Sequence, residues 1–276
     1  MIATCLSTAA LRTELDLQGF AILRGAIPED LLHESQTMME IWIEHMINNW
    51  IKAGKLSSAP NDTDFRSRFL RAWNDAGKPS YHRSPRGELV SLDGPRMFRL
   101  LGHSALVAIA RQALECEDIV SHGIWNSRPK APDQRFTDTP WHQDAQYFPD
   151  EPHARMVDMW FPLHDVDADS SCLAFCPQRH HDGIFPIHED AEGTGFLGLT
   201  PADAAHLESV PVPLRRGDVV VFTNLTPHHA LPNRTPLMRW SFDLRFTAGD
   251  SATALALDKG FRVGGDSYAD WRTKWD

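Results

Sequence analysis

The chain has 276 residues, with 27 Lys or Arg and 37 Asp or Glu, and its formal net charge at pH 7 is −10. This acidic balance argues against nucleic acid as a partner, because a phosphate backbone is bound by a basic surface. Hydrophobic residues make up 42% of the chain, and a core of that size needs no disulfide or structural metal.

No segment indicates export or membrane insertion. The first eleven residues lack a basic stretch followed by a long apolar core, and no run of about 18 apolar residues occurs. The cysteines are Cys5, Cys116, Cys172 and Cys176, and they do not form two zinc-binding pairs. We therefore expect a cytoplasmic protein without a membrane partner.

Helical patterns dominate the first part of the chain. Apolar residues recur there at helical spacing, and proline and acidic residues suit the first turn of the helix that starts at Pro28. The polar segment 55–93 is typical of a lid. We predict helices over residues 8–16, 28–50, 65–73 and 95–114, and one glycine-bounded strand over residues 19–25.

Strand patterns dominate from Asp118 onward. Helices first and strands later favour an α+β fold with helices on one side of an antiparallel sheet. The strand count and turn spacing fit a jelly roll. We expect one domain over residues 1–276, with helical cover and lid mainly in 8–114 and a jelly-roll core mainly in 117–248. The predicted strands cover residues 119–125, 157–163, 172–176, 219–223 and 240–246.

A His-x-Asp pair, His142 and Asp144, is the first candidate for chemistry. On a strand such a pair would face one side, because side chains alternate. Two histidines and one carboxylate hold ferrous iron on one face and leave positions open, so a third ligand must come from a distant strand. A surface histidine beside an acid is the alternative interpretation.

The spacing alone is a weak signal, because 14 histidines and 37 acids produce chance matches. His188 and Asp190 have the same spacing, but they lie in an acidic, glycine-containing stretch that is typical of a loop. His142 instead lies in the segment Pro-Trp-His-Gln-Asp-Ala-Gln-Tyr-Phe-Pro. We therefore take His142 and Asp144 as the candidate pair.

Several segments resemble the phytanoyl-CoA dioxygenase superfamily of iron- and 2-oxoglutarate-dependent oxygenases. They are residues 19–25, the Trp-His-Gln-Asp segment at 141–144, residues 165–173 and the strand 216–222. The resemblance runs from about Gly19 to Phe246. It implies a cupin-like double-stranded β-helix with N-terminal and flanking helices. It also implies Fe(II), 2-oxoglutarate and O2 as reactants, with ascorbate as a candidate reductant.

The distal motif offers two adjacent histidines, His228 and His229. The family places an asparagine five residues and an arginine eleven residues after the metal ligand. Only His228 meets both conditions, with Asn233 and Arg239. The resemblance therefore implies His228 as a ligand and predicts that His229 points away or packs behind the ligands.

The resemblance implies His142, Asp144 and His228 as the metal ligands and catalytic residues. Related halogenases carry a small residue in place of the carboxylate, so Asp144 favours hydroxylation over halogenation. The family often has serine two residues after the distal histidine, where this chain has Ala230. That departure gives more weight to Ser241 as a hydroxyl contact.

The expected cofactor-binding residues are Arg239, Ser241, Trp160 and Thr139. A guanidinium fork suits the distal carboxylate of 2-oxoglutarate, and Ser241 would face the same side of the strand. The alternative for Arg239 is an ion pair with Asp243. The resemblance places Trp160 in the cosubstrate pocket, and core packing is an equally compatible role.

Two functions remain open at this point. The first is a dioxygenase that hydroxylates or otherwise oxidises an unactivated C–H bond of a small molecule, with a natural-product or amino-acid-like substrate from secondary metabolism. The second is a non-catalytic double-stranded β-helix protein that binds a small ligand or a metal. Loss of the arginine or of a ligand would indicate the second, and none is lost. The sequence does not indicate the oligomeric state.

Overall fold

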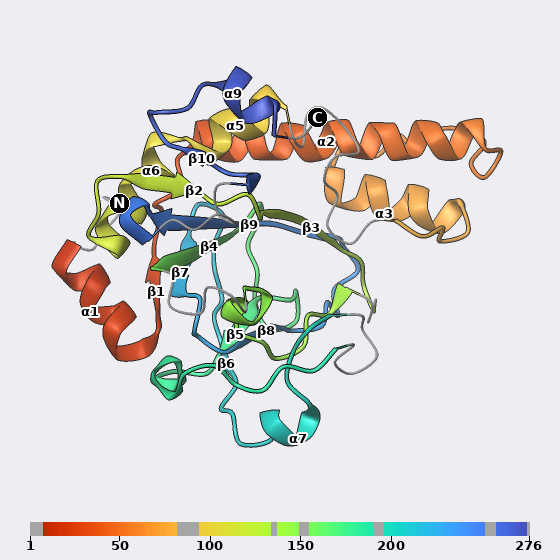
Figure 1. The fold of residues 1–276 in the computed structure, drawn as a ribbon. Helices are drawn as coiled ribbons and strands as arrows, with labels where there is room; N and C mark the ends of the chain where they lie inside the picture. The colour runs from red at the N-terminus through yellow and green to blue at the C-terminus, as the bar shows by residue number, and fades with distance from the viewer. Residues whose placement is uncertain are drawn as a thin grey trace.

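The computed structural model describes residues 8–81, 94–133, 137–148, 155–189, 196–251 and 258–274 (Figure 1). The helices are α1 (Thr8–Gln18), α2 (Glu29–Lys52), α3 (Phe65–Asp75), α5 (Pro95–Leu101), α6 (Ser104–Leu114), α7 (Pro201–Ala204) and α9 (Tyr268–Arg272), and the 3-10 helices are η2 (Asp144–Tyr147), η3 (Arg179–Asp182) and η5 (Gly249–Ser251). The strands are β1 (Phe20–Leu23), β2 (Ile119–Ser121), β3 (Asn126–Lys130), β4 (Met156–Pro162), β5 (Leu173–Phe175), β6 (Val210–Pro211), β7 (Val219–Thr223), β8 (His228–Ala230), β9 (Arg239–Ala248) and β10 (Phe261–Arg262).

Two antiparallel sheets form the centre of the fold. The larger sheet has the order β1-β7-β4-β9-β2-β10, with β3 paired to β9, and the smaller sheet has the order β6-β5-β8. The helices α2, α5 and α6 lie over the larger sheet, on the side away from the smaller one (Figure 1). The predicted α+β class, with helices and an antiparallel sheet, is confirmed.

Side chains alternate between the two faces of the central strands, so each strand contributes to two separate hydrophobic cores. On β4, Val157 and Met159 pack with the helices, whereas Trp160 packs with the smaller sheet. Strand β9 alternates in the same way. Its apolar residues face the helices, and its polar residues lie on the other side. The first group is Trp240, Phe242, Leu244 and Phe246, and the second is Arg239, Ser241, Asp243 and Arg245.

Aromatic side chains join the helices to the sheet. The ring of Trp42 on α2 lies 5.0 Å from Phe69 on α3 and 6.0 Å from Trp240 on β9. Buried aromatic rings of this size contribute strongly to packing, so α2 is fixed to the sheet behind the site. In the described part of the chain, no helix combines the length and apolar character that a membrane span requires.

The predicted helix over residues 95–114 is wrong, because α5 ends at Leu101 and α6 begins at Ser104. Extended backbone at His103 separates them, and the His103 ring accepts a hydrogen bond from the Ala105 amide. The polar cap satisfies an otherwise free amide of the first turn, which explains the break.

The predicted strand over residues 119–125 is also wrong. Strand β2 ends at Ser121, and the chain resumes as β3, which we did not predict. A side chain at Gly123 would collide with Lys259, since a Cβ there would lie 2.4 Å from the Lys259 Cβ. Pro129 argues against a central strand, but it is tolerated because β3 pairs only with β9.

Candidate metal centre and its cavity

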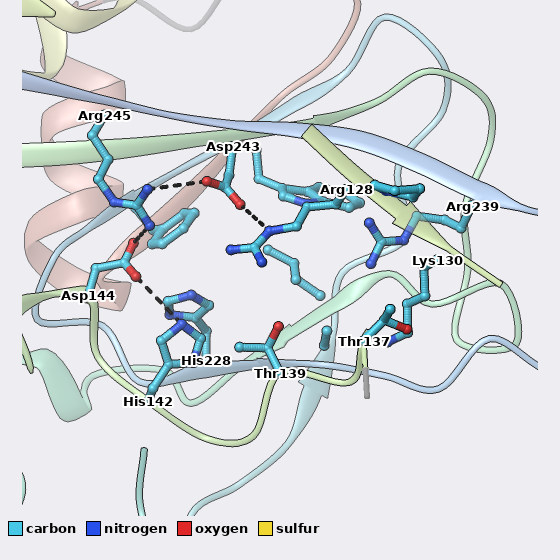
Figure 2. Close-up of a pocket in the computed structure, with 15 residues that line it drawn as sticks. Arg128, Lys130, Thr137, Thr139, His142, Asp144, His228, Arg239, Asp243 and Arg245 are labelled. Carbon is cyan, nitrogen blue, oxygen red and sulfur yellow. Dashed lines mark hydrogen bonds and ion pairs between the residues drawn. The ribbon is translucent and has the colours of Figure 1, made fainter. Parts of the chain in front are cut away.

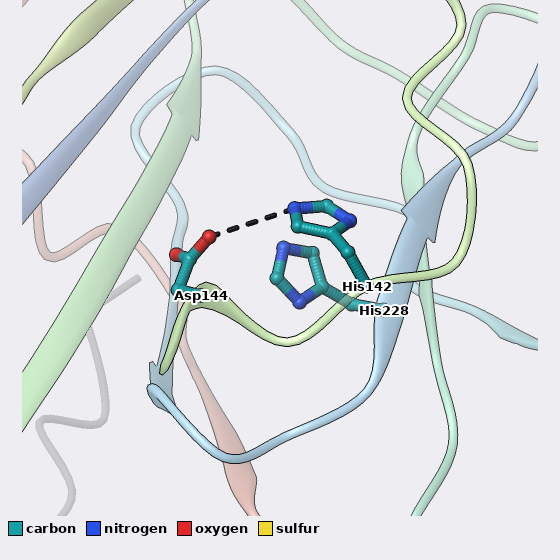
Figure 3. Close-up of side chains that lie close together, drawn as sticks. All are labelled: His142, Asp144 and His228. Atoms are coloured by element: carbon teal, nitrogen blue, oxygen red, sulfur yellow. Dashed lines mark ion pairs between the residues drawn. The ribbon is translucent and has the colours of Figure 1, made fainter. Parts of the chain in front are cut away.

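Three side chains from two distant segments of the chain meet between the two sheets (Figure 3). The backbones of His142 and His228 exchange two hydrogen bonds, each of 3.0 Å, and this places the two rings 4.2 Å apart. Asp144 begins η2. One ligand atom from each of the three buried residues lies within 4.8 Å of the others. The structure therefore brings together the three ligands suggested by the sequence.

The expectation that His142 and Asp144 share a strand is wrong. His142 forms an isolated bridge, and Asp144 starts a 3-10 turn. Gln143 between them holds the turn, because its side chain accepts from the Phe185 amide at 2.7 Å and donates to the Gly183 carbonyl at 2.8 Å. A fixed turn, rather than strand alternation, therefore aims both side chains at His228.

The two histidines are held so that the same ring nitrogen faces the centre. Nδ1 of His142 lies 2.8 Å from the Pro140 carbonyl, and Nδ1 of His228 lies 3.0 Å from the Thr226 carbonyl. A carbonyl only accepts, so each Nδ1 carries the proton and each Nε2 keeps its lone pair. Burial, and then the neighbouring His142, lowers the pKa of His228 to about 3, which keeps that ring neutral.

Arg245 holds the carboxylate of Asp144. Its Nη2 donates to Oδ2 of Asp144 at 2.9 Å, while Oδ1 of Asp144 lies 3.5 Å from Nε2 of His142. Burial, the largest single cause, raises the pKa of Asp144, but the charge of Arg245 and the contacts with His142 and His228 together hold that pKa well below its usual value. One carboxylate oxygen and two imidazole nitrogens therefore face a common point, and this donor set fits ferrous iron.

Two further carboxylates surround Arg245. Its Nε lies 2.8 Å from Asp158 and its Nη1 lies 3.2 Å from Asp243. Burial, and then the neighbouring Asp144, raises the pKa of Asp158 well above its usual value. Sequence reasoning missed Arg245 and Asp158. Alternation of polar and apolar residues along β9 would have placed Arg245 on the same side as Arg239.

The competing histidines lie elsewhere. Nε2 of His229 lies 2.8 Å from the Ser209 hydroxyl, and its ring packs 4.2 Å from that of Trp141, so it faces away from His228. His188 lies 3.0 Å from Asp203. Asp190, the acid of the competing His-x-Asp spacing, lies outside the described residues. Neither histidine belongs to the cluster.

A cavity extends from the three ligands to Arg239 on β9 (Figure 2). The guanidinium of Arg239 donates to the Ser241 hydroxyl at 2.5 Å and lies 5.6 Å from the centre of the Trp160 ring. Thr139 lines the cavity between the two ends. The four residues that we expected to bind the cosubstrate are therefore all at or beside this cavity.

Arg239 is a buried cation without a carboxylate partner among the described residues, and its Nε has no hydrogen-bond partner there. The alternative ion pair with Asp243 does not form, because Asp243 instead pairs with Arg128 and Arg245. Burial, and then the charge of Arg128, lowers the pKa of Arg239 only to about 10, so it stays charged at neutral pH. An unpaired buried charge is costly, and a bound carboxylate would offset that cost.

Lys130 lies beside Arg239 in the same wall of the cavity. Its Nζ contacts Asp138 at 2.6 Å and donates to the Leu231 carbonyl at 2.6 Å. Burial, and then Arg239, lowers the pKa of Lys130 to about 7, although Asp138 opposes the shift. Unlike Arg239, Lys130 therefore already has an anionic partner.

Comparison with known proteins agrees with this site. The family model described as Phytanoyl-CoA dioxygenase (PhyH) matches residues 15–241. The phytanoyl-CoA dioxygenase domain-containing protein 1 of Mus musculus is 32% identical over 106 residues, which are 37% of this chain. The match spans 36% of that relative's length.

Solved structures share the fold. The non-heme monooxygenase ThoJ has a TM-score of 0.62 at 16% identity, covering 95% of this chain and 86% of that one. The epimerase SnoN, solved with Fe3+, α-ketoglutarate (2-oxoglutarate) and nogalamycin RO, has a TM-score of 0.54 at 18% identity, covering 87% of this chain and 83% of SnoN. At these identities the likeness extends to the fold only.

Proposed function

Because the chain belongs to the phytanoyl-CoA dioxygenase (PhyH) family, we propose that it is an Fe(II)- and 2-oxoglutarate-dependent dioxygenase that hydroxylates or otherwise oxidises a C–H bond of a small molecule. The family match and the ligand cluster support iron and 2-oxoglutarate as the predicted cofactors. One observation carries the proposal. A His-Asp-His cluster and a buried arginine that has no carboxylate partner among the described residues share one cavity.

In this proposal the chain holds iron through Nε2 of His142, Oδ1 of Asp144 and Nε2 of His228. Two imidazoles and one carboxylate would hold iron on one face and leave positions for the cosubstrate and oxygen. When bound, iron and 2-oxoglutarate supply an oxidation that yields succinate and carbon dioxide. The protein contributes position, charge and exclusion of water.

Arg239 binds the distal carboxylate of 2-oxoglutarate in this proposal. Ser241 orients the guanidinium through the 2.5 Å hydrogen bond, and Trp160 covers one of its faces. Thr139 adds a hydroxyl along the path from Arg239 to the ligands. Burial of this end matters, because a guanidinium–carboxylate pair is stronger where water is excluded.

The fold supports the same proposal. We infer that the two facing sheets form a double-stranded β-helix, and that residues 1–276 form one domain. The ligands come from β8 and from the turn before η2, whereas Arg239 comes from β9. The cavity therefore lies between the two sheets, and α2, α5 and α6 cover the outer face of the larger sheet.

The substrate in this proposal is a small molecule of natural-product or amino-acid-like size. The support is indirect: SnoN, which shares the fold, was solved with nogalamycin RO. The intact Asp144 carboxylate favours hydroxylation over halogenation, because it would take the place on iron that a halide would need.

Anaerobic addition of Fe(II) and 2-oxoglutarate tests the proposed function. The dioxygenase should develop a weak metal-to-ligand absorption band in the visible, and His142→Ala should abolish it. With oxygen, the wild type should form succinate. A non-catalytic binding protein would form no succinate, and an unaltered visible spectrum in the folded wild type would contradict the proposal.

A further inference from the structure

Arg128 reaches into the cavity between the metal ligands and Arg239 (Figure 2). It lies on β3, opposite Ser241 of β9. Only its Nε is engaged, at 2.9 Å from Oδ2 of Asp243. Neither Nη atom forms a hydrogen bond to a described residue, and the side chain is 21% exposed. Two donors of this guanidinium are therefore open to a ligand in the cavity.

Arg128 is one of three described side chains that contact Asp243. Oδ1 of Asp243 accepts from the Asn126 amide at 2.5 Å and lies 3.2 Å from Nη1 of Arg245. Asn126 and Arg245 therefore contact one oxygen of the Asp243 carboxylate, and Arg128 contacts the other. Asp243 acts on Arg128, because its Oδ2 fixes the direction of the guanidinium.

Among the residues that line the cavity, cations outnumber carboxylates. Its lining contains the cations Arg128, Lys130, Arg239 and Arg245 and two carboxylates, Asp144 and Asp243. Fe(II) and the 2-oxoglutarate dianion cancel each other. Lys130 is paired with Asp138 outside the lining. A cationic lining with both Nη groups of Arg128 open is suited to an anionic ligand.

We propose that Arg128 is a second oxyanion-binding group of this cavity and that it binds a carboxylate or phosphonate of the primary substrate. The inference rests on the proposed function, in which Arg239 serves the distal carboxylate of the cosubstrate. The C1 carboxylate of 2-oxoglutarate has the same chemistry, so the test separates the two sources. The guanidinium carbon of Arg128 also lies over the ring of Phe196, 6.0 Å from the ring centre.

The test uses acetate and methylphosphonate as probes, titrated by calorimetry at constant ionic strength into anaerobic protein loaded with Fe(II) and 2-oxoglutarate. The variants are Arg128→Gln, which removes the charge, and Arg128→Lys, which keeps it. Arg155→Gln is the matched control, because Arg155 is an exposed arginine that pairs with Asp250 far from the lining. Thermal unfolding checks that each variant is folded.

The wild type and Arg155→Gln should bind at least one probe with equal affinity. Arg128→Gln should weaken that binding tenfold or more, Arg128→Lys should fall between, and the affinity for 2-oxoglutarate should change less than threefold. Equal probe binding by Arg128→Gln and wild type, or no probe binding by the wild type, would overturn the proposal. So would a tenfold loss of 2-oxoglutarate affinity in Arg128→Gln with unchanged probe binding, because the guanidinium would then serve the cosubstrate.

A failure of the proposed dioxygenase function would be distinguishable from a failure of the proposed role of Arg128. It would remove the visible band and the 2-oxoglutarate binding of the wild type. Probe titration into the protein without cofactors would still report whether Arg128 binds an oxyanion.

Discussion

Arg245 donates from Nη2 to Oδ2 of Asp144 at 2.9 Å, so a guanidinium from β9 fixes which carboxylate oxygen faces the two histidines. The same strand carries Arg239, six residues earlier and on the same side. Strand β9 therefore sets the orientation of a metal ligand at one end of the cavity and supplies the candidate cosubstrate anchor at the other. In the proposed function, iron binding and cosubstrate binding would therefore both depend on β9.

Arg245→Gln should weaken iron binding about 10- to 100-fold, as expected when a residue that orients a metal ligand is removed. The carboxylate of Asp144 would lose its main partner and become free to rotate. Titration with Fe(II) under anaerobic conditions, or with Co(II), measures the change. Arg155→Gln is the control for loss of one positive charge, and equal metal affinity in all three proteins would remove Arg245 from this role.

The candidate ligands could be predicted because their spacing is local or matches a family motif. His142 and Asp144 are two residues apart, and Asn233 and Arg239 follow His228 at the distances that the family uses. The backbone that aims the pair was predicted wrongly, since the turn at Asp144 depends on contacts of Gln143 with the distant segment around Phe185.

The charged residues behind the candidate ligands, Asp158 and Arg245, could not both be predicted from the sequence. Asp158 and Arg245 face each other because β4 and β9 pair in a register that places them side by side. Register is set by tertiary packing as well as by the strand pattern, and neither residue belongs to a motif. Strand β3 was missed for a different reason: Pro129 and Lys130 are poor strand formers.

The two adjacent distal histidines should behave differently. His228→Ala should abolish metal binding and turnover, because its Nε2 faces the other two ligands. His229→Ala should keep iron binding and at least part of the activity, since that ring contacts Ser209 and Trp141 instead. Metal content after Fe(II) loading and succinate formation give the answer. An inactive, metal-free His229→Ala beside an active His228→Ala would reverse the assignment.

Lys130 should make stability depend on pH. Its pKa is about 7 in the folded protein and 10.5 is its ordinary value, which applies to the unfolded chain. Between these values the unfolded chain binds more protons at this residue, so its contribution makes the free energy of unfolding rise with pH. Lys130→Met should reduce that slope between about pH 7 and pH 10.

Denaturant unfolding of wild type and Lys130→Met at several pH values between about 7 and 10 measures how the free energy of unfolding changes with pH. Lys52→Met is a suitable control, because Lys52 is an exposed lysine at the end of α2. If Lys130→Met and wild type have parallel curves, the buried ammonium does not titrate in this window.

The affinity for 2-oxoglutarate in Arg239→Ala tests the central claim most directly. Arg239 is buried, is charged at neutral pH and lacks a carboxylate partner among the described residues. Removing one partner of a buried ion pair costs about 3–5 kcal/mol, which is roughly two to three orders of magnitude in affinity. Arg239→Lys should recover only part, because an ammonium cannot make the two-pronged contact.

Anaerobic titration of 2-oxoglutarate into Fe(II)-loaded wild type, Arg239→Ala and Arg239→Lys measures these affinities, with iron content determined on the same samples. We predict a loss of about 100-fold or more in Arg239→Ala, with iron binding retained because Arg239 is not a metal ligand. A folded, iron-loaded Arg239→Ala protein that binds 2-oxoglutarate as tightly as the wild type would contradict the assignment of this cavity.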